Sequence, residues 1–146
     1  MKFEDIKNNY NINLYLGILP ENEERRNINK KNNFIGISNK LENLYHIKHD
    51  ICKENIDLQD NTVTIFQAED TLQYIEFENI EKIINEIYRL LKPGGLFRLS
   101  LPDYNFDIYN RRTLKNEEGK IIFDSGGGGL YDKKINKIKG GHLWFP

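Results

Sequence analysis

The sequence predicts an α/β domain with a doubly wound, mostly parallel sheet. Residues 61–103 read as strand, helix and strand, a βαβ unit whose two strands must be parallel. Further short apolar runs, typical of strands, precede this unit between residues 12 and 51. The chain has 146 residues and is 38% hydrophobic, which is enough for one domain with its own core.

The first strand of the βαβ unit is predicted within residues 62–68, TVTIFQA. This short apolar run contains Val63 and Ile65, β-branched residues that are enriched in strands. The glutamate and aspartate that follow mark its end.

The helix is predicted over residues 80–91, because its large apolar side chains recur at helical spacing with charged residues between them. Lys92 suits the negative end of a helix, Pro93 ends it, and Gly94 and Gly95 permit a left-handed turn. The run LFRLSL, residues 96–101, is then predicted as the second strand, closed by Pro102-Asp103.

Upstream, residues 12–19 are predicted as the first strand and residues 34–37 as the second. A third strand is expected within residues 44–51, and residues 56–61 are expected to form a loop. In doubly wound sheets, ligands bind beyond the carboxyl ends of the strands. The places to search are therefore after Leu16, after Ile37, around Asp50 and after Gln67.

The order of residues in this unit resembles the class I S-adenosylmethionine-dependent methyltransferases. The turn AEDTLQY (68–74), the run RLLKPGG (89–95) and a strand ending in Pro102-Asp103 follow the pattern of that family. The resemblance implies a Rossmann-like methyltransferase core in a single domain over residues 1–146. It also implies that the terminal strand pair of that core is lacking, because the sequence ends soon after GGHLW (140–144), which resembles the segment before the next helix of the family.

The resemblance implies S-adenosylmethionine as cofactor, with Gly17, Asp50, Ile51, Ala68 and Glu69 lining its site. Two positions depart from the family. Only Gly17 remains of the glycine-rich turn after the first strand, and Ser38 and Asn39 stand where an acidic residue usually contacts the ribose. From the residues alone, Asp50 reads equally well as the cap of a turn before Lys53, and Glu69 as part of the N-terminal cap of the crossover helix.

The resemblance places the methyl acceptor near the end of the last strand. It implies Asp103 and His142 as catalytic residues, with Tyr104 and Arg111 binding the substrate. Three of these residues have a structural alternative: Asp103 as the start of a turn, Arg111 as a side chain that faces water and His142 as a side chain packed beside Trp144. Residues 107–120 read as a polar excursion on the substrate side.

The composition argues against several classes of protein. The net charge of −1 argues against a nucleic-acid-binding role, and no run of about 20 apolar residues could span a membrane. A single cysteine excludes an internal disulfide, and the histidine spacing shows no metal site. We expect a cytoplasmic protein.

Two functions are consistent with these patterns. The first is a methyltransferase acting on a small-molecule or otherwise polar acceptor, and the alternative is a non-catalytic module with the same fold that binds or assembles with a partner. A dinucleotide-dependent dehydrogenase fits worse, because the first strand is not followed by G-x-G-x-x-G. Either the sequence is truncated, or a homodimer or a protein partner is expected to cover the sheet edge that the missing strands would leave exposed.

Overall fold

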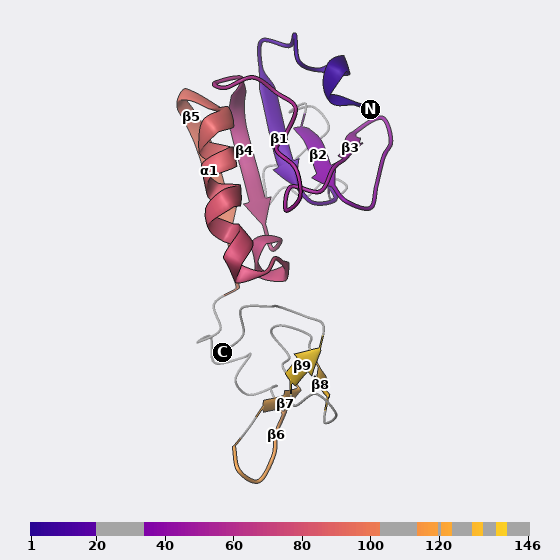
Figure 1. Ribbon diagram of the computed structural model, residues 1–146, viewed down its shortest axis with the longest axis vertical. Coiled ribbons are helices and arrows are strands. Elements are labelled where there is room, and N and C mark those ends of the chain that lie inside the picture. Colours follow the sequence, from indigo (N-terminus) through magenta and orange to yellow (C-terminus); the bar gives the residue numbers. More distant parts are fainter. Residues whose placement is uncertain (20–33, 103–113, 120, 124–129, 133–136, 140–146) are drawn as a thin grey trace.

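The computed structural model describes residues 1–19, 34–102, 114–119, 121–123, 130–132 and 137–139 (Figure 1). Within these residues the chain forms two sheets, one with the strand order β3-β2-β1-β4-β5 and one with the order β6-β7-β8-β9. Every strand pair of the first sheet is parallel. The predicted α/β class and parallel sheet are therefore confirmed.

The elements of the first sheet are β1 (Ile12–Leu16), β2 (Phe34–Ser38), β3 (His46–Lys48), β4 (Val63–Glu69) and β5 (Leu91–Ser100). The helix α1 (Ile80–Leu90) joins β4 to β5, as predicted. Short 3-10 turns are η1 (Phe3–Asp5), η4 (Leu72–Tyr74) and η5 (Phe77–Asn79). The chain runs outward from β1 to β2 and β3, then returns to β4 on the other side of β1, so the topological switch point lies between β1 and β4.

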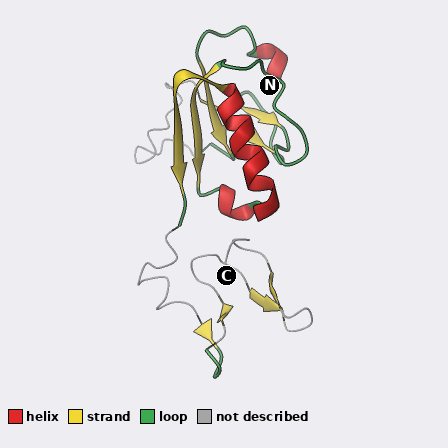
Figure 2. Ribbon diagram, turned by 60° about the vertical axis from the view of Figure 1, so that its left-hand side comes forward, coloured by secondary structure: helices red, strands yellow, loops and turns green. Residues whose placement is uncertain are grey.

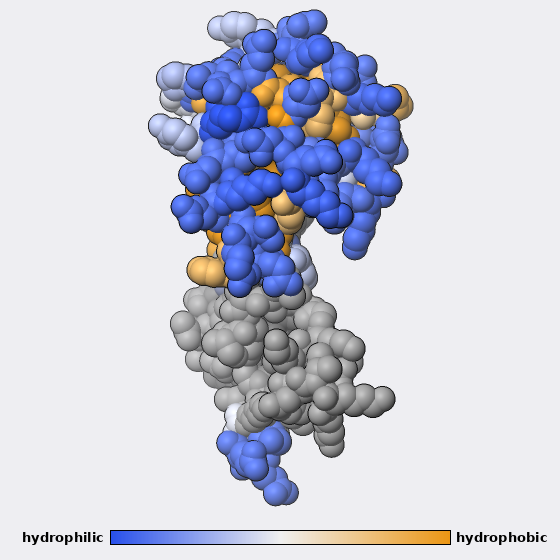
Figure 3. Space-filling view, in the orientation of Figure 1, coloured by the Kyte–Doolittle hydropathy of each residue, from blue (hydrophilic) through white to orange (hydrophobic). Residues whose placement is uncertain are grey.

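The helix α1 packs across one face of the sheet (Figure 2). Its buried stripe is Ile83, Ile87 and Leu90, each at most 1% exposed, and it belongs to one apolar cluster with Phe66 and Ala68 of β4. Burying each of the three large side chains is worth about 1.5–3 kcal/mol relative to leaving it in water. Most of the opposite side of α1 is polar, and Figure 3 shows polar side chains over much of the face seen in that view.

Two connections between parallel strands contain no helix. Residues 39–45 join β2 to β3, and residues 49–62 join β3 to β4. The second connection packs onto the sheet beside α1, because Ile51, Ile56 and Leu58 are buried in the same core cluster. A packed loop thus covers sheet area that a crossover helix covers in a regular βαβ unit.

The predicted boundaries of two early strands were too long or displaced. The first strand ends at Leu16, not Leu19, because Gly17 leaves the extended conformation with a φ of +119°. The third strand is limited to His46–Lys48, whereas the prediction began at residue 44. Asn43 instead makes an isolated antiparallel bridge with His46, so the chain turns back just before β3.

The KPGG segment lies at the start of β5 and not in a separate turn before it. Val63 pairs with Leu91 and Ile65 with Leu96, so residues 92–95 form an irregularity in the ladder. Gly94 has a φ of +79°, as the left-handed turn predicted from the sequence requires. At Gly95 a Cβ would lie 2.9 Å from the carbonyl oxygen of Lys92, which is too close for any other residue without a shift.

The second sheet consists of the short strands β6 (Leu114–Lys115), β7 (Ile121–Phe123), β8 (Leu130–Asp132) and β9 (Lys137–Lys139), all paired antiparallel. The polar excursion predicted over residues 107–120 includes β6, and none of the four strands was predicted, because they are too short to show a hydrophobic period. The expectation of a single domain over residues 1–146 stays a prediction. No helix in the described part of the chain is long and apolar enough to cross a bilayer.

Candidate cofactor cleft

A cleft of about 510 Å³ opens at the carboxyl ends of the parallel strands. The arrowheads of β1, β2 and β4 point to this edge, which is the lower edge of the sheet in Figure 1. Four segments supply its walls: residues 15–18 at the end of β1, 37–40 at the end of β2, 49–52 after β3 and 69–71 at the end of β4, with Tyr74 and Ile75 beyond. All four places indicated by the sequence therefore meet in one cleft of the size that small-molecule sites have.

Gly17 forms the turn that ends β1 at the cleft. Its N–H donates a 2.8 Å hydrogen bond to the carbonyl oxygen of Ile37, so the turn is tied to β2. A Cβ at Gly17 would lie 3.2 Å from Oγ1 of Thr71, and its φ of +119° is one that other residues rarely adopt. Both the backbone and the available space thus favour glycine.

Thr71 links the two strands at the switch point. Its hydroxyl oxygen lies 2.9 Å from the carbonyl oxygen of Leu16 and 3.0 Å from that of Glu69, in positions where the hydroxyl can donate to either. Thr71 thus joins the ends of β1 and β4, a role that no motif in the sequence marks. Thr71 has this role because β1 and β4 lie side by side in the sheet.

His46 stabilises the segment after β1 through a hydrogen bond. The N–H of Leu19 donates to its Nε2 at 2.9 Å, so Nε2 is unprotonated and Nδ1 carries the proton toward Oδ1 of Asn43, also at 2.9 Å. Burial lowers the pKa of His46, which favours this neutral form. From the sequence, His46 was weighed only as a possible metal ligand, and this contact was not predicted.

Asp50 begins a tight turn that we call the Asp50 turn, residues 50–54. Its carbonyl oxygen accepts the N–H groups of Lys53 and Glu54 at 3.0 and 3.1 Å, and its Oδ1 accepts the N–H of Cys52 at 3.1 Å. Lys53 adds an ion pair at 3.4 Å. The capping interpretation of Asp50 is therefore confirmed, and the same residue also lines the cleft beside the apolar side chain of Ile51, which is 5% exposed.

Glu69 is the last residue of β4 and is nearly buried, at 4% exposed. Its Oε1 lies 2.6 Å from Nε of Arg98 on β5 and accepts a 3.2 Å hydrogen bond from the amide of Gln67. The interpretation of Glu69 as an N-terminal cap of the helix is wrong, because α1 starts only at Ile80, with Asn79 as its N-cap. Strand pairing with Ser100 extends β4 to Glu69 and delays the helix.

Ala68 does not line the cleft; it is fully buried in the core, one residue before the cleft begins. Asp70, the residue after Glu69, does line it and has a φ of +51°. Its N–H donates to the carbonyl oxygen of Ser100 at 3.1 Å, which fixes this left-handed backbone at the rim. Aspartate is one of the few residues other than glycine that tolerate such a conformation.

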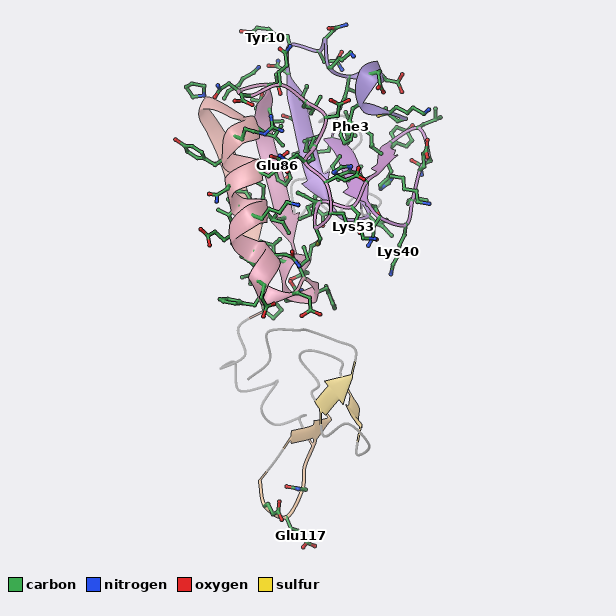
Figure 4. All side chains as sticks on the ribbon, viewed as in Figure 1. Phe3, Tyr10, Lys40, Lys53, Glu86 and Glu117 are labelled. Atoms are coloured by element: carbon green, nitrogen blue, oxygen red, sulfur yellow. The ribbon has the colours of Figure 1, made fainter. Side chains whose placement is uncertain are left out.

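The wall after β2 is polar. Ser38 is 8% exposed and its hydroxyl accepts the N–H of Lys40 at 3.2 Å, while the N–H of His49 donates to its carbonyl oxygen at 2.9 Å. Asn39 and Lys40 are exposed and also line the cleft. Figure 4 shows Lys40 and Lys53 on the segments that follow β2 and β3.

Four site residues inferred from the sequence lie outside the described residues: Asp103, Tyr104, Arg111 and His142. The described part of the chain holds no group of three or more His, Cys, Asp or Glu side chains suited to a metal ion. What the structure brings together is a cleft with apolar walls, at Leu16, Ile37 and Ile51, and a polar rim. Such a surface suits a ligand with a flat apolar part and several polar groups.

Comparison with protein families gives one relevant result. The profile of the family described as "Methyltransferase domain" matches residues 16–99, more than half of the 146-residue chain. The matched region contains β4, α1, all of β5 except Ser100, and every cleft-lining residue except Tyr15, and it confirms the resemblance drawn from the sequence. No curated protein sequence matches the chain significantly.

Proposed function

Because the chain belongs to the methyltransferase domain family, we propose that it is an S-adenosylmethionine-dependent methyltransferase that acts on a small or otherwise polar acceptor. One observation supports this most directly: the cleft lies at the carboxyl ends of the strands around the switch point and is lined by Gly17, Asp50 and Glu69. Residues that lie far apart in the sequence thus line one cleft.

The chemistry of the cleft fits an adenosyl group. Leu16, Ile37 and Ile51 offer apolar walls to a base, and the carboxylate of Asp50, whose side chain is 30% exposed, can accept hydrogen bonds from an exocyclic amine or a hydroxyl. The hydroxyl and amide of Ser38 and Asn39 can bind ribose hydroxyls, although more weakly than a carboxylate would.

The other end of the cleft is acidic. Asp70 lines it at the end of β4, next to Glu69, whose charge is paired with Arg98. A carboxylate here suits a ligand that carries positive charge, because opposite charges a few ångströms apart attract in a partly buried site. Gly17 lets the backbone of the β1 turn approach the ligand without a side chain in between.

When bound, S-adenosylmethionine supplies a methyl group on a positively charged sulfur. The contribution of this chain is to orient the two reactants and exclude water, so proximity supplies much of the rate and few catalytic side chains are needed. As part of the proposal, Asp103 and His142 orient the acceptor or take its proton, and Tyr104 and Arg111 bind it. Cytoplasmic location and a homodimer or protein partner stay predictions.

The second candidate is a non-catalytic module with the same fold. The observation that favours it is the wall after β2, where Ser38 and Asn39 replace a carboxylate. The two candidates differ in a measurable property, because a module without cofactor affinity gives no heat with S-adenosylmethionine or S-adenosylhomocysteine.

Titration calorimetry with both ligands separates the candidates. We expect dissociation constants on the order of 1–100 µM for the wild type, in the usual range for enzyme ligands. Asp50→Ala should weaken binding by about tenfold, the value of one charge-assisted hydrogen bond. Asp50→Asn can still cap the turn, so a similar loss in this variant assigns the effect to the carboxylate and not to the turn.

Asp57→Ala is the matched control, because Asp57 is exposed and does not line the cleft. Its affinity should equal that of the wild type. Absence of binding at millimolar ligand, from protein with a cooperative unfolding transition, would exclude the enzyme and leave the module.

A further inference from the structure

The helix α1 makes a direct contact with the Asp50 turn through Lys82. The ammonium group of Lys82 lies 3.1 Å from the carbonyl oxygen of Cys52 and 3.2 Å from that of Lys53. Lys82 does not line the cleft itself, whereas Asp50, Ile51 and Cys52 do. The contact thus joins the back of a cleft wall to the helix that crosses the sheet.

The two carbonyl groups lie where a lysine can replace water as their partner. The Asp50 turn has the hydrogen bonds of a single helical turn, from the N–H groups of Lys53 and Glu54 to the carbonyl oxygen of Asp50. A helical turn that does not continue leaves its last carbonyl groups without partners inside the turn, and a lysine side chain can satisfy them. Lys82 comes from a different element, α1, and takes this role at the protein surface.

Further hydrogen bonds join α1 to other residues of the 49–62 connection. Oε1 of Glu86 accepts the N–H of Ile56 at 2.7 Å, and Arg89 donates to the carbonyl oxygens of Ile56 and Leu58 at 2.9 and 2.8 Å. Glu86 and Arg89 are themselves joined at 2.7 Å. Figure 4 labels Glu86 on α1 and Lys53 on the connection.

We propose that Lys82 is a positioning residue of the ligand site, which holds the Asp50 turn in the conformation that presents Asp50 and Ile51 to the cleft. The proposal rests on the proposed function for the identity of the ligand but not for the contact itself. Without Lys82, the carbonyl oxygens of Cys52 and Lys53 lose their hydrogen bonds to α1, and the Asp50 turn opens more often.

Cys52 offers a test that needs no ligand. It is the only cysteine of the chain, it lies within the Asp50 turn, and its side chain is partly buried. The rate at which an aromatic disulfide reagent labels this thiol reports how often the turn opens, because a buried thiol reacts slowly. We expect Lys82→Met, which keeps the apolar stem, to increase the labelling rate about three- to tenfold.

The charge change alone predicts the opposite. Burial and Asp50 raise the pKa of the Cys52 thiol, and the positive charge of Lys82 counteracts that rise. Removing Lys82 therefore leaves less thiolate, so faster labelling can come only from opening of the turn. Lys82→Arg should restore the slow rate, because a guanidinium can donate to both carbonyl oxygens.

Lys48→Met is the matched control: this exposed lysine precedes the turn but does not line the cleft, and its loss should not accelerate labelling. Equal labelling rates in wild type and Lys82→Met, with cooperative unfolding in both, would overturn the proposal. So would acceleration that Lys82→Arg fails to reverse.

Saturating S-adenosylhomocysteine then separates this proposal from the proposed function. If both are right, the ligand slows labelling of the wild type and brings the Lys82→Met variant back toward the wild-type rate, since binding selects the closed turn. If the labelling difference appears but no ligand slows it, the positioning contact stands and the proposed ligand is wrong.

Discussion

Gly36 of β2 and His46 of the edge strand β3 are in contact beside the β1 turn, and this contact can be tested by adding one methyl group. A Cβ at Gly36 would lie 2.2 Å from Cδ2 of His46, 2.7 Å from its Nε2 and 3.1 Å from the carbonyl oxygen of Gly17. Two of these atoms belong to one buried ring, which is 5% exposed. Gly36→Ala therefore has to displace the imidazole.

The cost follows from what the imidazole contacts. Overpacking a filled interior by one methyl group costs about 1–3 kcal/mol. Displacing His46 also breaks its hydrogen bond with the N–H of Leu19, whose loss from a partly buried site costs about 1–2 kcal/mol. We expect Gly36→Ala to lower the free energy of unfolding by about 2–5 kcal/mol, a large part of the about 5–15 kcal/mol typical of a domain.

Urea unfolding of four proteins measures this cost: the wild type, Gly36→Ala, His46→Ala and the double variant. Removal of the imidazole makes room for the added methyl group, so Gly36→Ala should cost at least about 1 kcal/mol less in the His46→Ala background. If Gly36→Ala costs the same in both backgrounds, the steric argument is refuted, and the cost must come from the backbone of β2.

Three further predictions concern pH and single side chains. Burial lowers the pKa of His46 below its ordinary 6.5, so the stability from its neutral ring is complete above that pH and is lost as the pH falls below it. The urea midpoint should therefore fall between pH 7.5 and pH 5, both in the wild type and in the control variant His49→Gln. A midpoint that does not change with pH would contradict this prediction. Burial opposes ionisation of Glu86, but hydrogen bonds from Arg89 and Ile56 outweigh it and lower the pKa of Glu86. Glu86→Gln should therefore lower the free energy of unfolding by about 2 kcal/mol at pH 7, and by less in acid, where Glu86 of the wild type becomes protonated. An equal loss at both pH values in chemical denaturation would count against the ion pair. Gly17→Ala, at a φ of +119°, should cost about 1–3 kcal/mol of stability in thermal unfolding, and an unchanged melting temperature would show that the turn adapts freely.

The βαβ unit could be predicted from the sequence because its signals are local. The apolar stripe at Ile83, Ile87 and Leu90 has the helical period, and KPGG places proline and glycine where a helix has to end. The ligand-binding edge could also be predicted, because parallel strands put their carboxyl ends together whatever their side chains are. That is why Gly17, Asp50 and Glu69 were found before the structure.

The contacts that shape the cleft could not be predicted in this way, because each joins residues far apart in the chain. Leu19 and His46 are 27 residues apart, Leu16 and Thr71 are 55 apart, and Cys52 and Lys82 are 30 apart. No period or motif marks such pairs. Glu69 shows the same limit, since its sequence context favoured a helix cap, and pairing with β5 made it the buried end of a strand.

The sequence by itself thus determined which segments form strands along the chain, the crossover helix and the edge where a ligand would bind, since these depend on local propensity and on the rules of parallel sheets. The tertiary structure alone decided that a loop attached by Lys82, Glu86 and Arg89 covers the sheet in place of a helix. It also decided that one neutral imidazole supports the β1 turn. The physical reason is that hydrogen bonds and ion pairs between distant segments form only after folding has brought those segments together.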